Sequence, residues 1–237
     1  MIKTEEIRYR DGGETVNGMF GWDAAHERRR PGILVVHGGA GLDDHARGRA
    51  RRFAEAGFVA FACDMYGESV TGNRDRVLQH IGELRRDRAA LCRRAQAAID
   101  QFASHPLIDG RLAAVGYCFG GMVALELARG GVDLAGVVSV HGSVETFRQA
   151  EPSRIKGRIL VCHGALDPHV PMAHIAAFTD EMNRVGADYQ LIVYGGAMHG
   201  FTHETAVQPV NGVAYNATAD ARSSRAIQIF FDGVFAS

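Results

Sequence analysis

Short apolar segments alternate with longer stretches of helical character along most of this 237-residue chain. The apolar segments, of four or five residues each, cover residues 33–36, 59–63, 112–115, 137–140, 159–162 and 190–194. The stretches that favour helix cover residues 45–56, 79–102, 122–129, 174–185 and 219–235. Buried strands that alternate with helices form a mostly parallel sheet with helices on both faces. We therefore predict an α/β fold with a doubly wound, mostly parallel sheet.

The region before the first apolar segment has a different pattern. It carries turn signals at Asp11-Gly12-Gly13 and Asn17-Gly18, and it contains the only tryptophan, Trp22. This pattern predicts a small antiparallel element at the N-terminus. No low-complexity linker, internal repeat or charge block divides the chain, so we expect residues 1–237 to form a single domain.

Composition narrows the classes of partner. The chain has 26 basic and 27 acidic residues and a formal net charge of −1, so no global field attracts nucleic acid or an anionic membrane. The four cysteines show no C-x-x-C spacing, and we expect neither a metal nor another cofactor. The first residues lack an apolar signal segment, which makes a cytoplasmic location the expectation. We expect a monomer or a homodimer that acts on a small molecule.

The sequence Gly-Tyr-Cys-Phe-Gly-Gly at residues 116–121 lies between an apolar segment and a helical one. A strand, a tight turn and a helix in this order are typical of a nucleophile elbow, here with Cys118 in the place where serine is more usual. A thiol at a helix N-terminus is favoured as the reactive thiolate. Two alternatives are a phosphate-binding turn and a buried structural cysteine. The chain lacks the Gly-Lys-Ser/Thr of a Walker loop, and no G-x-G-x-x-G opens the first helix.

Two further residues complete a catalytic arrangement. Asp167 follows the fifth apolar segment, in a turn stiffened by Pro168 and Pro171, and His199 follows the last segment in a glycine-flanked loop. A thiol nucleophile needs a histidine base and a carboxylate that orients the histidine. The chain order of nucleophile, acid and histidine is that of α/β-hydrolases. We therefore predict a triad of Cys118, His199 and Asp167.

An acyl-transfer site also needs backbone amides directed at the oxygen that becomes negative. One candidate is the amide of Phe119, which follows the nucleophile. The other is Gly39 in the turn His37-Gly38-Gly39 after the first apolar segment, a sequence similar to the HGGG-type loop of esterases. The alternative for this turn is a plain strand-to-helix connection. If the turn does supply an oxyanion donor, His37 is expected to brace it through its ring nitrogens.

Other residues at strand ends have weaker assignments. Tyr66 lines the pocket or packs with its hydroxyl in solvent, and residues 202–220 form a partial lid or an ordinary surface loop. We interpret His141, His163 and His169 as structural, because no pair of histidines has a metal-binding helical spacing.

Three motifs together resemble the dienelactone hydrolase family, over nearly the whole chain. They are the elbow at residues 116–121, Gly164-Ala165-Leu166-Asp167-Pro168, and Met198-His199-Gly200-Phe201. The resemblance implies a single-domain cysteine hydrolase of the α/β-hydrolase superfamily, with Cys118, Asp167 and His199 as its triad and the amides of Gly39 and Phe119 as its oxyanion donors. A more particular resemblance is to phosphotriester-hydrolysing members of this family.

Two positions depart from the family pattern. Where dienelactone hydrolases carry a glutamate after the first core strand, this chain has Gly38, and where they carry an arginine after the catalytic histidine, it has His203. A second family arginine has no clear counterpart among Arg85, Arg86 and Arg88. Without an arginine clamp, a substrate carboxylate is poorly held, so a neutral ester is the expected substrate. The expected pocket comprises His37, Gly38, Tyr66, Phe201 and His203.

The sequence thus predicts a cysteine-dependent hydrolase of activated neutral carboxylesters, extending to phosphotriesters, that works through a covalent intermediate. The alternatives are a lactone hydrolase of the dienelactone type, an acyltransferase that uses an alcohol or amine instead of water, and a non-catalytic binding protein with a hydrolase fold.

Overall fold

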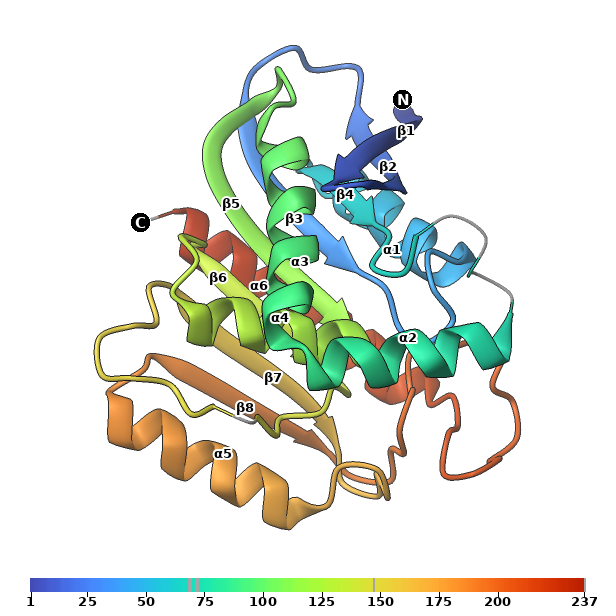
Figure 1. Cartoon of the computed structure of the whole chain (residues 1–237), viewed down its shortest axis with the longest axis vertical. Helices are drawn as coiled ribbons and strands as arrows, with labels where there is room; N and C mark the ends of the chain where they lie inside the picture. The colour runs from blue at the N-terminus through green and yellow to red at the C-terminus, as the bar shows by residue number, and fades with distance from the viewer. Residues whose placement is uncertain (68–69, 71–72, 147, 237) are drawn as a thin grey trace. The chain divides into compact units, whose positions relative to one another are not determined.

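The structure is a computed structural model that describes all residues except 68–69, 71–72, 147 and 237. An eight-stranded, mostly parallel sheet has the strand order β1-β2-β4-β3-β5-β6-β7-β8, and helices connect most of its strands (Figure 1). The predicted α/β fold is therefore confirmed. The chain contains two compact units, Met1–Val115 and Gly116–Ser237, which are described in turn. The single domain over residues 1–237 stays a prediction.

The first unit begins with a long hairpin of β1 (Ile2–Asp11) and β2 (Glu14–Asp23), which pair antiparallel along their whole length. The predicted antiparallel element is present, and Gly12, with a φ of 56°, supplies the left-handed turn. The turn predicted at Asn17-Gly18 is wrong, because both residues lie within β2. Gly18 serves packing instead, since a Cβ atom there would lie 2.3 Å from the ring of Phe61.

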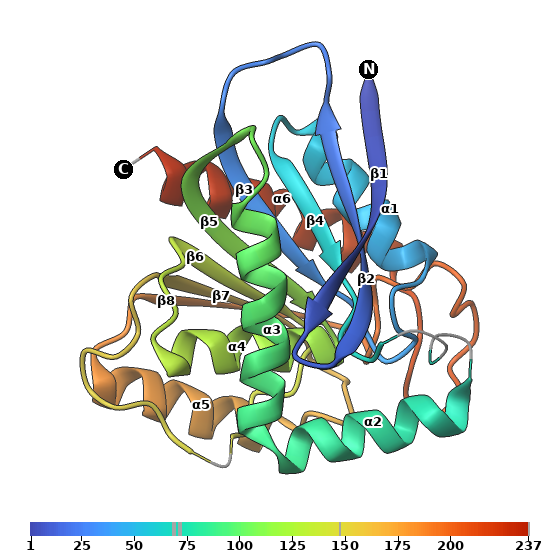
Figure 2. The ribbon, with the colours of Figure 1, turned by 45° about the horizontal axis from the view of Figure 1, so that its top comes forward.

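Helices cover both faces of this unit. Successive strand residues point to opposite faces: at Gly21, a Cβ atom would lie 3.6 Å from the side chain of Ala54 in α1 (Asp44–Glu55), whereas the ring of Phe20 lies 6.3 Å from that of Phe102 in α3 (Arg88–Ala103). Figure 2 shows α1 and α3 on the two sides of these strands. Beside β2 lies β4 (Val59–Cys63), which pairs in parallel with β3 (Arg30–Val36).

One predicted helix is two. Residues 79–102 were expected to form an uninterrupted helix, but α2 (Arg74–Arg86) ends at Asp87 and α3 begins directly after it. Asp87 leaves helical geometry, with φ −106° and ψ 83°, and its carboxylate accepts a hydrogen bond from the Ala90 amide at 2.9 Å. Aspartate favours such a cap over a helix interior, so the prediction of one helix is wrong.

The second unit contains the end of β5 and three further strands that pair in parallel. Residues on opposite faces of β6 (Gly136–Val140) again face different helices: a Cβ at Gly136 would lie 2.8 Å from Phe230 of α6 (Ala217–Phe235), while the Ser139 hydroxyl lies 2.6 Å from where a Cβ of Gly121 in α4 (Phe119–Gly130) would be. The elements of this unit are β5 (Ile108–Tyr117), α4 (Phe119–Gly130), β6 (Gly136–Val140), β7 (Arg158–Gly164), α5 (Met172–Val185), β8 (Tyr189–Tyr194) and α6 (Ala217–Phe235).

Candidate active site

The turn between β5 and α4 holds Cys118 in an unusual backbone conformation, with φ 53° and ψ −114°. This region is sparsely populated by residues other than glycine and costs of order 1–3 kcal/mol. The turn also requires glycine at position 116, because a Cβ atom there would lie only 1.8 Å from the carbonyl oxygen of Gly120. Strand and helix therefore approach as closely as a nucleophile elbow demands.

Backbone contacts hold this turn, and the thiol takes no part in them. The amide of Cys118 lies 3.0 Å from the carbonyl oxygen of Val140 and 3.2 Å from Nδ1 of His141, and it donates to both. The carbonyl of Cys118 accepts from the amide of Gly121 at 3.0 Å. Because the side chain of Cys118 makes no capping hydrogen bond, its sulfur is left for other partners.

The structure brings Cys118, His199 and Asp167 together in the second unit. Nε2 of His199 lies 3.0 Å from Sγ of Cys118, and Nδ1 of His199 lies 2.8 Å from Oδ2 of Asp167. The Asp167 side chain is fully buried, whereas that of His199 is 13% exposed. Both distances are within hydrogen-bond reach, and the roles of these residues as nucleophile, base and orienting acid stay a prediction.

Asp167 is held rigidly by the turn that carries it. Its Oδ1 accepts hydrogen bonds from the amides of His169 at 2.8 Å and Val170 at 3.1 Å. Burial alone would raise the pKa of Asp167, but the contact with His199 and these two amides outweigh burial and lower the pKa below its usual value. The carboxylate therefore stays ionised and keeps its free oxygen for His199.

His199 has a strongly perturbed pKa. Burial acts to lower the pKa, but the hydrogen bonds to Asp167 and Cys118, together with their negative charge, outweigh burial and raise it to about 10. At neutral pH the imidazole is thus protonated, with Nδ1–H directed at the carboxylate and Nε2–H directed at the sulfur.

The segment after His199 returns to contact it. The amide of His199 donates to the carbonyl of Gly212 at 3.1 Å, and the amide of Ala214 donates to the carbonyl of His199 at 3.1 Å. The expected irregular segment 202–220 is shorter than predicted, because α6 begins at Ala217. Gly212 and Ala214 of this segment thus hold the loop that carries His199. Closure of the segment over the site stays a prediction.

His141 is a residue that the sequence analysis did not place in the site. It is fully buried and has a φ of 40°. Since Nδ1 accepts from the Cys118 amide, the ring proton resides on Nε2, which donates to Oγ1 of Thr202 at 2.9 Å. The His141 ring also lies 5.4 Å from the His199 ring, edge to face. His141 therefore connects the backbone of Cys118 to the loop that carries His199 and Thr202, and in the sequence only its position at a strand end pointed to this role.

The other expected pocket residues of the second unit lie on the same loop as the base. Phe201 is fully buried, with its ring 5.0 Å from that of His141 and 5.5 Å from that of Tyr194. His203 is partly exposed and lies 5.7 Å from the His141 ring. Phe201 thus packs the loop that carries His199 against His141 and Tyr194. A substrate contact by Phe201 or His203 stays a prediction.

In the first unit, the expected oxyanion turn is closely braced. Nδ1 of His37 donates to the carbonyl of Gly38 at 2.7 Å, and Nε2 accepts from the amide of Met65 at 2.9 Å. The Tyr66 hydroxyl lies 3.4 Å from the same Gly38 carbonyl. The bracing expected of His37 is therefore seen, and Tyr66 is buried against this turn.

Asp64 completes this cluster. It accepts hydrogen bonds from the amides of Tyr66 at 2.8 Å and Gly67 at 3.2 Å, and it lies 3.7 Å from Nε2 of His37. Burial would raise the pKa of Asp64, but His37 and the two amides outweigh burial and lower it. Gly39 follows this turn in the first unit, whereas Phe119 opens α4 in the second, so their joint role as oxyanion donors stays a prediction.

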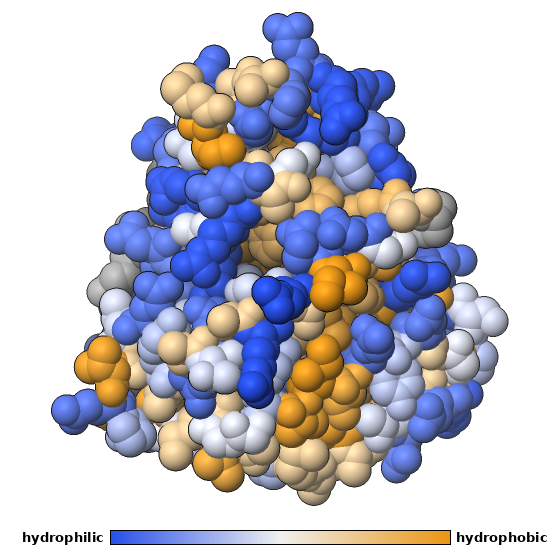
Figure 3. Space-filling model, turned by 180° about the vertical axis from the view of Figure 1, so that it is seen from behind, coloured by the Kyte–Doolittle hydropathy of each residue, from blue (hydrophilic) through white to orange (hydrophobic). Residues whose placement is uncertain are grey.

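Two further properties concern metal ions and membranes. Within the described residues, no group of three or more histidine, cysteine or acidic side chains is arranged to hold a metal ion. Within the same residues, every helix is too short or too polar to cross a bilayer. On the face shown in Figure 3, hydrophilic residues cover much of the upper part, and a band of hydrophobic residues runs down the lower centre.

The chain is similar to proteins of one family. The dienelactone hydrolase family model matches residues 19–235. A crystal structure of a dienelactone hydrolase-like promiscuous phosphotriesterase, P91, from metagenomic libraries is 40% identical, with a TM-score of 0.92 over 99% of both chains. A probable 2-oxo-3-(5-oxofuran-2-ylidene)propanoate lactonase from Bradyrhizobium sp is 28% identical over 74% of this chain and 75% of its own length. An uncharacterized protein of Caenorhabditis elegans, K02A2.1, is 35% identical over 60% of this chain and 93% of its own. The chain is therefore a hydrolase that belongs to the dienelactone hydrolase family.

Proposed function

We propose that this protein hydrolyses activated neutral esters through a covalent intermediate on Cys118. The observation that carries this proposal is the 3.0 Å separation between Sγ of Cys118 and Nε2 of His199, with Nδ1 of the same ring 2.8 Å from Asp167. A sulfur at a helix N-terminus, next to a protonated imidazole, combines two features that activate a cysteine nucleophile.

The reaction follows from these positions. The thiolate attacks the ester carbonyl, a C–S bond forms, and the carbonyl electrons move to oxygen. The tetrahedral intermediate collapses, the C–O bond to the alcohol breaks, and His199 gives its Nε2 proton to the departing alkoxide. Water then attacks the thioester while neutral His199 takes one of its protons. The acid leaves, and the thiolate and the protonated imidazole are restored.

The developing oxyanion needs donors. The amide of Phe119 directly follows Cys118 and lies at the first position of α4, where backbone amides point toward the N-terminal end of a helix. We assign the second donor to Gly39. Losing one oxyanion donor typically costs about 100-fold to 1000-fold in rate. The braced His37-Gly38 turn supports Gly39, because a donor that is already fixed needs no reorganisation during the reaction.

The substrate class follows from what replaces the family's charged residues. Gly38 and His203 stand where a glutamate and an arginine are found in dienelactone hydrolases, and neither offers a bidentate clamp for a carboxylate. A neutral carboxylester fits this environment, and so does an uncharged phosphotriester. The similarity to a promiscuous phosphotriesterase over 99% of the chain supports the second substrate. A five-coordinate phosphorus transition state further needs space opposite the sulfur for the leaving group.

A panel of esters tests the proposal. We expect p-nitrophenyl acetate to give a burst of nitrophenol equal to the enzyme concentration, and we expect iodoacetamide to abolish both burst and turnover. Absence of turnover on every ester would favour the non-catalytic binding protein. Faster turnover of a dienelactone than of neutral esters would favour the lactone hydrolase, and ester or amide products with added acceptors would favour an acyltransferase. Aryl ester cleavage with no acceleration of paraoxon would remove the phosphotriester extension.

A further inference from the structure

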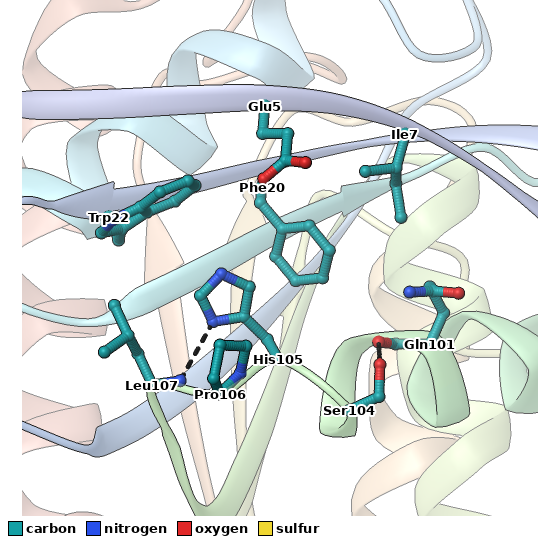
Figure 4. A pocket seen from close by; sticks show the side chains of 9 residues that line it. All are labelled: Glu5, Ile7, Phe20, Trp22, Gln101, Ser104, His105, Pro106 and Leu107. Atoms are coloured by element: carbon teal, nitrogen blue, oxygen red, sulfur yellow. Dashed lines mark hydrogen bonds between the residues drawn. The ribbon is translucent and has the colours of Figure 1, made fainter.

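A groove of about 380 Å³ lies in the first unit, between the β1–β2 hairpin and the end of α3. Figure 4 shows the side chains of Glu5, Phe20, Trp22 and His105 gathered around the same space. The volume and the mixture of aromatic and polar groups match those of small-molecule sites. The reactions proposed above do not use any of these residues.

The hairpin register creates the groove. Glu5 lies directly opposite Phe20, so the two side chains share one face of the sheet. Trp22 lies two residues further along β2 and therefore points to the same face. His105, just after α3, packs between the two aromatic residues, with its ring 4.6 Å from that of Phe20 and 5.2 Å from that of Trp22. Three ring systems thus adjoin one carboxylate.

The charges of the lining residues have one sign. Among the nine residues that line the groove, Glu5 is the only acidic one and none is lysine or arginine. His105 favours its neutral form, because Nδ1 accepts from the amide of Leu107 at 3.3 Å, and because burial and the positive charge of Arg30 lower the pKa of the ring against the opposing charge of Glu5. The groove therefore combines aromatic faces with one exposed negative charge.

We propose that this groove binds a small organic cation of the alkylammonium class. A cation near aromatic faces is attracted by the negative charge above each ring, by about 0.5–1 kcal/mol at exposed sites, and Glu5 adds a direct charge partner. An anionic ligand would face the carboxylate, and a neutral ligand would leave it unused. The ligand chemistry is thus set by the pairing of Glu5 with the rings.

The single tryptophan of the chain makes the test direct, because Trp22 provides all of the tryptophan fluorescence. Choline is titrated into the full-length protein, and 3,3-dimethylbutan-1-ol, which has the same shape without the charge, is the matched ligand. We expect a saturable change in Trp22 emission with choline, and at least about three-fold weaker binding of the alcohol.

Two neighbouring substitutions separate the charge from general effects on the strand. Glu5→Gln keeps the shape of the side chain and is expected to weaken choline binding about three- to five-fold. Glu6→Gln is the matched control, since Glu6 pairs with Met19 in the hairpin, points to the other face and contacts Arg47; it should leave choline binding unchanged. Equal binding of choline and the alcohol, no saturable change, or no effect of Glu5→Gln would each overturn the proposal.

Discussion

Two histidines of this protein lie at strand ends beside a buried aspartate, yet their surroundings differ. His37 uses both ring nitrogens on the backbone: one donates to Gly38 and the other accepts from Met65. His199 uses one nitrogen on the carboxylate of Asp167 and directs the other at a sulfur. The same two residue types therefore form a backbone brace in one unit and, in the proposed function, the reactive centre in the other.

The difference lies in how the aspartates are used. Both carboxylate oxygens of Asp64 accept hydrogen bonds from backbone amides, and Oδ1 lies 3.7 Å from Nε2 of His37. Asp167 spends one oxygen on two amides and keeps the other for His199 at 2.8 Å. A histidine can act as a base only when one ring nitrogen faces a group that can give up a proton. The contacts of the ring show whether this is so, whereas the amino-acid composition does not.

Removing the sulfur is the strongest test of this contrast. We expect Cys118→Ala to lower kcat/KM on p-nitrophenyl acetate by roughly 10⁴-fold or more, because the covalent route is lost. Cys92→Ala, which removes a partly exposed thiol on α3, is the control and should keep the activity. A Cys118→Ala protein with wild-type turnover would remove the sulfur from the reaction.

Changing the orienting acid should separate the two histidines by activity. We expect Asp167→Asn to lower kcat by about 10³-fold to 10⁴-fold with the fold retained, since the imidazole loses its charge partner and its fixed orientation. Circular dichroism serves as the check on folding. A loss of less than about ten-fold would show that Asp167 does not orient the base.

His141 lies between these extremes, because it touches the nucleophile only through the backbone. We expect His141→Phe to lower kcat about 10-fold to 100-fold with little change in KM, as a displaced base weakens proton transfer. Thr202→Val, which removes only the partner of Nε2, should have a smaller effect in the same direction. If kcat fell only in proportion to the loss of Tm in both variants, the role of His141 would be purely structural.

The brace should respond in stability rather than in chemistry. We expect Asp64→Asn to lower the free energy of unfolding by about 1–3 kcal/mol, since one oxygen that accepts from a buried amide is replaced by a donor. Urea unfolding measures this change. A variant with unchanged stability and a kcat as low as that of Asp167→Asn would make the two aspartates equivalent and break the comparison.

The last test concerns the pH dependence of stability. The folded pKa of His199 is raised to about 10, above the unfolded value of about 6.5, so its pairing stabilises the fold fully below pH 6.5 and loses this contribution as the pH rises toward 10. We expect the difference in Tm between wild type and His199→Gln to be largest at pH 6 and to shrink by pH 10. A difference that grows with pH would contradict the raised pKa.

Much of this architecture could be predicted because burial patterns are local. Each predicted apolar segment lies in a strand of the structure. The glycines at residues 116–121 correctly indicated a close approach of strand and helix. The break at Asp87 was missed because helix periodicity continues through it, and only the cap on Ala90 shows that the chain turns. The turn at Asn17-Gly18 was wrong because a glycine that makes room for Phe61 looks the same in sequence as one that bends the backbone.

The triad could be proposed from chain order and from a family resemblance, whereas the place of His141 could not. Its role depends on a backbone amide of Cys118 and a hydroxyl of Thr202, which are distant in sequence and carry no motif. Contacts made through main-chain atoms leave no trace in side-chain patterns, so residues that act in this way emerge only from coordinates.

The elbow is built from main-chain hydrogen bonds and from the absence of side chains at its glycines, while the thiol itself contributes nothing to its shape. The backbone of the turn therefore does not depend on which atom ends the side chain at position 118. We therefore expect Cys118→Ser to keep the shape of the turn, so that a change in reactivity would come from the side-chain atom and from its distance to His199 and not from a new backbone conformation.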